Sequence, residues 1–188
     1  MAELISRNIL DDEILVRYLF FGHFKRKKPA IYDNIMFGNI YIDTRDRGVS
    51  LLRYRYNDEN ECLKRGLETM QDLAGFYIFK KCDFLDSIKA HIEDNNEGFE
   101  AIIVSSPLDE NEKVISDEIE VYTNTPINPG HADLHYINPA TLIGEEPNTA
   151  IRRFSRVLAK YSKYVLLNEL EFESDSVLPV DFKKIINQ

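Results

Sequence analysis

The chain has 188 residues, of which 44% are apolar and 29% are charged, and its formal net charge is −9. This length suits one domain with a full-sized core, and the composition excludes a disordered chain. No apolar run approaches the ~20 residues that a membrane-spanning helix needs. Four acidic residues among the first 15 are the wrong charge for a secretory or transit peptide. We therefore expect a cytoplasmic protein that does not enter a membrane.

The first half of the chain predicts three strands and a helix. In chain order these are a strand (residues 14–24), a basic loop (25–29), a strand (39–43), a hairpin loop (44–48), a strand (49–56) and a helix (57–73). The strand predictions rest on β-branched and aromatic residues and on alternation. The helix prediction rests on Leu63, Leu67 and Met70, which recur on one face behind a capping Asn57.

The second half predicts three more strands and two more helices. In chain order these are a strand (75–81), a helix (83–93), a strand (99–105), a turn (107–113), a strand (114–123), a loop (124–147), a helix from Asn148 or Thr149 whose apolar stripe reaches Val165, and an acidic tail (169–188). Four prolines and two glycines make 124–147 a long loop with room for one short element. The tail is expected to end in a short docking segment through Phe182, Ile185 and Ile186.

These elements predict an α+β fold over residues 1–188 as a single domain. We expect a mainly antiparallel, twisted sheet of about five or six strands with three to four helices packed on it. The two cysteines, Cys62 and Cys82, form no CxxC pair, and we expect both to be buried, reduced and inert.

A candidate catalytic or metal site lies in the loop. His131, Asp133 and His135 alternate, so an extended backbone places all three on one face. Imidazole and carboxylate suit zinc or another divalent transition metal. Further ligands would come from elsewhere in the chain: His91, Glu118 or Glu120. The two histidines could instead act as acid and base, with Asp133 orienting one of them, or simply bond loop carbonyls and hold the segment in shape.

A candidate anion site follows from the segregation of charge. Residues 17–55 hold nine Lys or Arg against three acids, and residues 147–168 hold five Lys or Arg and no acid. Such segregation can focus an anion onto the basic region. The candidate contacts are Arg17, Arg53, Arg55, Arg152, Arg156 and Lys160. Arg53 and Arg55 alternate with tyrosines along a strand. The last three form a helical ridge at i, i+4 and i+8, which Lys163 continues at i+11. The alternative is a solvated helix face paired with acids elsewhere.

A third pattern resembles a known family. Arg17 on a first strand, Ser50 on a middle strand and Glu118-x-Glu120 on a late strand resemble the order found in ADP-ribosyltransferases. The resemblance implies that the Arg and Ser hold a dinucleotide while the last Glu polarises its ribose. The Ser-Thr-Ser context of that family is absent here, and strand-borne residues of these types are common on solvated faces.

The sequence leaves two functions open. The first is an intracellular binding module that recognises a partner protein or a small phosphate-bearing anion through its basic surface. Nucleic acid is the less favoured target, because the total charge is acidic. The second is a small hydrolase or transferase, metal-dependent or acid–base, centred on His131, Asp133 and His135.

Overall fold

The computed structural model describes residues 2–25, 35–42, 48–69, 72–95, 99–125, 128–137, 147–170 and 179–188. Within these ranges the strands are β1 (Ile14–Phe20), β2 (Val49–Arg53), β3 (Leu73–Lys80), β4 (Glu100–Ser105), β5 (His131–Ile137) and β6 (Lys163–Leu166). The helices are α1 (Glu59–Thr69), α2 (Lys81–Asn95), α3 (Pro147–Tyr161) and α4 (Phe182–Ile186). The expected α+β class is confirmed.

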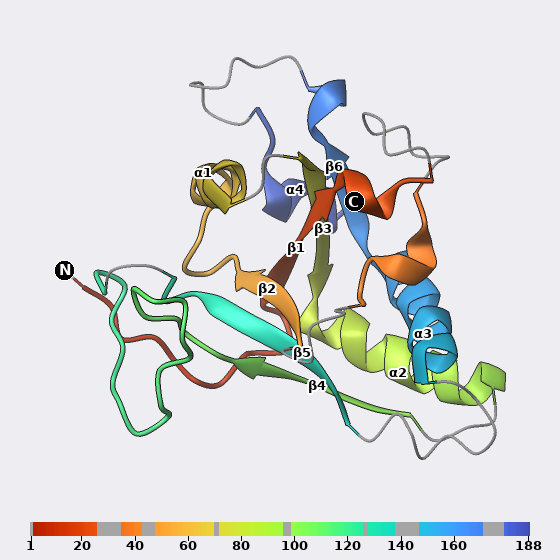
Figure 1. The fold of residues 1–188 in the computed structure, drawn as a ribbon, viewed down its shortest axis with the longest axis horizontal. Helices are drawn as coiled ribbons and strands as arrows, with labels where there is room; N and C mark the ends of the chain where they lie inside the picture. Colours follow the sequence, from red (N-terminus) through yellow and green to blue (C-terminus); the bar gives the residue numbers. More distant parts are fainter. Residues whose placement is uncertain are drawn as a thin grey trace.

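The six strands form one antiparallel sheet in the order β4-β5-β2-β1-β3-β6. The longest pairing joins the central strands β1 and β3 from Ile14 opposite Lys80 to Phe20 opposite Leu73, with an irregularity after Leu19. The sheet is strongly twisted. In Figure 1, β4 and β5 run at a steep angle to β1 and β3. The twist leaves β4 and β5 projecting toward the N-terminal side of the molecule.

Helices cover both faces of the sheet. Successive residues of a strand point to opposite faces, so Leu15 packs in the core cluster under α2 and α3 while Val16 packs in the one under α1 and α4. Phe84 of α2 and Phe154 of α3 meet edge to face with ring centres 6.0 Å apart. On the other face, Phe182 of α4 is fully buried, as expected for a docking tail. No helix of the described residues has the length and apolar character to cross a bilayer.

The 107–125 excursion, which connects β4 toward β5, packs against an N-terminal arm of residues 2–10. The expected strand at 114–123 is wrong for the described chain, since this region forms turns and isolated bridges. Leu4 bridges Tyr122, and the main-chain N–H of Ile5 donates to Val121 O at 2.8 Å. The arm therefore forms hydrogen bonds with main-chain groups of the 114–123 segment, which the sequence analysis had expected to pair within the sheet.

The expected strand at 39–43 is also wrong over its described part. Phe37–Asn39 forms a 3₁₀ turn, and Ile40 and Tyr41 follow it into the core. Ser155 of α3 supplies the reason, because its hydroxyl accepts from the N–H of Tyr41 at 3.2 Å and lies 2.6 Å from Phe37 O. The hairpin loop predicted at 44–48 lies outside the described residues except for Gly48.

Smaller differences concern where elements begin and end. β1 ends at Phe20 and a 3₁₀ turn follows it, and α1 ends at Thr69, so that Leu73 opens β3. The cap of α1 is Asp58, whose Oδ1 accepts from the N–H of Glu61 at 2.9 Å. The one short element that the 124–147 loop could hold is strand β5. Val165 belongs to β6, because α3 ends before it.

Candidate functional site

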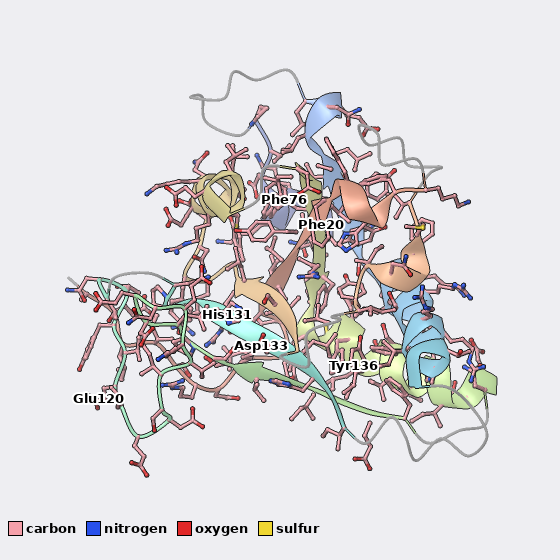
Figure 2. The ribbon with its side chains drawn as sticks, in the orientation of Figure 1. Phe20, Phe76, Glu120, His131, Asp133 and Tyr136 are labelled. Carbon is pink, nitrogen blue, oxygen red and sulfur yellow. The ribbon has the colours of Figure 1, made fainter. Side chains whose placement is uncertain are left out.

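The structure places the histidine cluster on β5, between β2 and β4. Figure 2 shows His131 and Asp133 next to each other along this strand, and each is only 6% exposed. Ser106, directly after β4, joins them. Its Oγ lies 2.6 Å from Asp133 Oδ2 and 3.0 Å from His131 Nδ1, and that Nδ1 also lies 3.0 Å from Ser106 O. The arrangement has the Nδ1–H donating to Ser106 and the serine hydroxyl donating to the carboxylate.

This geometry differs from that of a catalytic triad. In a triad the serine bonds Nε2 of the histidine and the carboxylate bonds Nδ1, whereas here Ser106 lies between His131 Nδ1 and Asp133. Burial is the main cause that lowers the pKa of His131, against the opposing effect of Asp133. A neutral His131 forms no ion pair with Asp133, although Oδ2 lies 3.7 Å from Nδ1. The cluster is well suited to fastening the end of β4 to β5.

The other proposed metal ligands do not join this cluster. His135 is half-buried beside Gly48, where an added Cβ would lie 2.9 Å from the imidazole ring. His91 packs its ring against Phe99, with centres 4.9 Å apart, in the core under α2 and α3. Glu120 lies far out on the 107–125 excursion in Figure 2. Among the described residues, no three His, Cys, Asp or Glu side chains gather as a metal site.

Two of the proposed anion contacts require correction, because the structure buries them. Arg17 is 6% exposed and donates from Nε to Ile40 O at 3.2 Å and from Nη1 to Ser50 O at 3.0 Å. Arg53 is 0% exposed and pairs with Glu13. Both guanidinium groups hold main chain or a carboxylate of the fold itself, so neither reaches a surface ligand.

The positions of the residues concerned do not support the resemblance to ADP-ribosyltransferases. Glu118 and Glu120 lie in a turn region of the excursion instead of on a strand. Arg17, the proposed dinucleotide contact, is committed to main-chain oxygens. Ser50 is exposed on β2 opposite Asp133.

Arg55 stays at the surface but is already paired. Its Nη2 lies 2.9 Å from Glu3 Oε1, with 45% of the arginine side chain exposed. It lines a pocket of about 580 Å³ together with Tyr54, Tyr56 and Asp58. The lining holds the three acids Asp12, Glu13 and Asp58 against the two cations Arg55 and Lys183, so the pocket has no net preference for an anion.

The ridge on α3 lines a second pocket, of about 650 Å³. Arg152, Arg156 and Lys160 form one wall, and the segment 35–39 forms the other. Lys25 and Ala159 complete the lining. The structure thus brings together three of the six proposed anion contacts. It adds a fourth cation, Lys25, which the sequence analysis had placed in the basic loop 25–29.

The wall opposite α3 is fixed by hydrogen bonds. Ser155, fully buried, holds the 3₁₀ turn through Phe37 O and the N–H of Tyr41. Asn39 accepts from Arg152 Nη1 through its Oδ1. Gly38 lies so close to α3 that an added Cβ would be 3.2 Å from Arg156 Nε. These contacts give the pocket a shape that does not depend on a ligand.

The pocket keeps its positive charge. Within the part of the chain that the structure describes, Lys25, Arg152, Arg156 and Lys160 form no ion pair. The partner of Arg152, Asn39, is a neutral amide. Four cations around one concave surface attract an anion more strongly than the same charges on a convex face.

Several residues of this site escaped the sequence analysis. The sequence analysis placed Asn39 at the start of a strand and assigned Met36, Phe37 and Gly38 to no element, although the Gly-Asn pair is a turn signal. Ser155 carried no signal beyond its place between the apolar and basic faces of α3. Ser106 was likewise hidden, because a serine after a strand is ordinary.

No family model, no curated protein and no solved structure matches this chain. Function is therefore inferred from the geometry and chemistry of these residues alone.

Proposed function

We propose that this protein is an intracellular module that binds a small phosphate-bearing anion in the pocket between α3 and residues 35–39. The single observation that carries the proposal is the convergence of Arg152, Arg156, Lys160 and Lys25 on one concave surface without ion pairs among the described residues. A guanidinium matches the oxygens of a phosphate through paired N–H donors, and an ammonium adds a mobile charge.

The shape of the site favours a small ligand over a partner protein. A volume of about 650 Å³ falls within the roughly 300–1,000 Å³ of typical small-molecule sites. A protein partner would use a broader and flatter area than this. Nucleic acid is disfavoured by the acidic balance of the whole chain, −9. The cytoplasmic location stays a prediction from the sequence.

The second function, a hydrolase or transferase centred on His131, Asp133 and His135, has less support from the geometry. His131 and Asp133 are nearly sealed from solvent and bonded to Ser106. Neither of the two pockets described above is lined by them. A buried and satisfied polar cluster more often holds a fold together than performs chemistry.

Isothermal titration of inorganic pyrophosphate into the full chain tests the proposal. We expect saturable one-site binding that the double variant Arg156→Glu/Lys160→Glu weakens by at least about tenfold, a change equivalent to 1.4 kcal/mol. The matched control is the double variant Lys64→Glu/Lys163→Glu, which makes the same change in net charge at two exposed positions, on α1 and β6, outside the pocket. Absence of binding, or equal loss in the control, would overturn the proposal.

A further inference from the structure

We infer that the ligand is amphipathic, an organic diphosphate whose apolar or aromatic body lies against the segment 35–37 while its phosphates meet the α3 ridge. This inference rests on the proposed function and narrows it to a class of ligand. It depends on a feature that inorganic anions would not use, the apolar half of the pocket. That half consists of Ile35, Met36, Phe37 and Ala159.

The apolar half is a continuous wall beside the cations. Ile35 and Ala159 are buried at 3% and 8% exposure, and Met36 and Phe37 are half-buried. A phosphate alone would leave the half-buried side chains of Met36 and Phe37 in contact with water inside a concave site. Covering these side chains with an apolar body releases that water and favours binding in proportion to the area covered. Most small-molecule sites share this design of apolar walls and few polar anchors.

The helical positions separate the two halves of the pocket. Arg152, Arg156 and Lys160 follow one another at four-residue spacing and form one row along α3. Ser155 and Ala159 form the neighbouring row, and Ser155 is bonded to Phe37 O. The phosphates therefore have their contacts along the outer row, and the body has its contacts across the inner row toward Met36 and Phe37.

Gly38 and Asn39 connect the two halves. Without a Cβ at Gly38, the Arg156 side chain can lie close to the main chain of the turn. Asn39 accepts from Arg152 through Oδ1, and its Nδ2 lies 3.6 Å from Met36 Sδ. One asparagine thus orients a cation of the head site and a thioether of the body site.

The side chains of the wall accept either of two bodies. Met36 offers a soft, adaptable surface both to an aliphatic chain and to the face of a nucleobase, and Phe37, which packs against the core cluster, lies behind it in the wall. Both belong to the shared chemistry of a diphosphate on an apolar body. ADP and geranyl diphosphate represent the two sources, and inorganic pyrophosphate represents the head group alone.

Isothermal titration of these three probes into the full chain provides the test. We expect ADP or geranyl diphosphate to bind at least about tenfold more tightly than pyrophosphate. The preferred probe then identifies the body as aromatic or aliphatic. Equal affinity for all three probes would refute the inference while leaving the proposed phosphate site in place. Failure of pyrophosphate and of both organic diphosphates to bind would refute both.

A variant of the wall provides the second arm. Met36→Ser should reduce the advantage of the organic diphosphate several-fold and leave the pyrophosphate Kd within about twofold, because only the body contact changes. Leu67→Ser on α1 is the matched control, since Leu67 is 48% exposed and lies outside the pocket. A Met36→Ser protein that loses pyrophosphate affinity in the same proportion would contradict the division of the pocket into two halves.

Discussion

Arg53 of β2 and Glu13, the residue before β1, form an ion pair that is almost completely removed from solvent. Arg53 Nε lies 2.5 Å from Glu13 Oε1 and Nη2 lies 2.9 Å from Oε2, with side-chain exposures of 0% and 4%. The same guanidinium donates to the main-chain oxygens of Ser6 and Asn8 and to the hydroxyl of Ser105. One side chain therefore joins the N-terminal arm, β2 and β4.

Arg53→Met should destabilise the protein by about 3–5 kcal/mol, because it leaves the Glu13 carboxylate buried without a partner. The free energy of unfolding from urea titration measures the effect. The double variant Glu13→Leu/Arg53→Met should recover part of the loss, since it removes the unpaired charge. Arg55→Met, at an exposed ion pair, is the control and should cost about 1 kcal/mol or less. A comparable loss in both single variants would contradict the role given to Arg53.

His23 makes the stability depend on pH. It is 4% exposed, its Nδ1 has no hydrogen-bond partner within the described residues, and its ring lies 3.8 Å from that of Phe20. Burial, with a smaller effect of Arg17, lowers the pKa of His23 to about 3. Between pH 6.5 and 3 the unfolded chain takes up a proton there that the folded chain does not. Stability should therefore fall as the pH falls through this window.

Between pH 7 and pH 5, the His23→Phe variant should lose about 2 kcal/mol less free energy of unfolding than the unchanged protein. Phenylalanine keeps a ring beside Phe20 and has no proton to take up. Urea titrations of both proteins at the two pH values give the comparison. The account of His23 fails if both proteins lose the same stability on acidification.

The difference between Arg53 and Arg55 shows what the sequence could predict and what it could not. Alternation along the predicted strand 49–56 would put the two arginines, which are two positions apart, on the same face, whereas β2 ends at Arg53 and leaves Arg55 beyond the strand. Alternation does not say which one meets a carboxylate that lies 40 positions earlier in the chain, as Glu13 does. The α+β class and the ridge on α3 were predictable because both follow from local periodicity. The burial of Arg53 depends on a contact distant in sequence.

The pocket was only half predictable for a similar reason. Its basic wall is a helical row that can be read from spacing, and its other wall is a turn whose shape depends on Ser155, more than a hundred positions away from Tyr41. The isolated segment 37–41 has the composition of a strand as well as of a turn. A hydrogen bond to α3 decides between them, and local patterns contain no information on that bond.

Gly75→Ala should disrupt the pairing of β3 with β6. An added Cβ would lie 2.0 Å from Val165 O, a main-chain atom that cannot move without separating the strands. We expect a loss of about 3 kcal/mol or more in the free energy of unfolding, and faster amide exchange in β6. Gly22→Ala is the control, because its Cβ would meet only the Phe20 ring at 3.4 Å. If both variants are equally stable, the close approach of β6 at Gly75 is incorrect.

Gly38→Ala should weaken ligand binding without unfolding the protein. The new Cβ, 3.2 Å from Arg156 Nε, displaces the end of a flexible side chain, which costs little stability. The pyrophosphate Kd should rise about twofold or more, because the Arg156 side chain must shift by a few tenths of an ångström within the pocket. Titration calorimetry gives the Kd, and thermal unfolding confirms the fold. An unchanged Kd would show that Arg156 does not contact the phosphates from this position.

The most direct measurement of the central claim is a nuclear magnetic resonance titration of the ¹⁵N-labelled chain with pyrophosphate. The account predicts chemical-shift changes concentrated at the amides of Gly38 and Asn39 and along α3 from Arg152 to Lys160. Shifts centred on the second pocket at Tyr54–Asp58, shifts around His131, or no shifts at concentrations well above those of ordinary metabolites would contradict it.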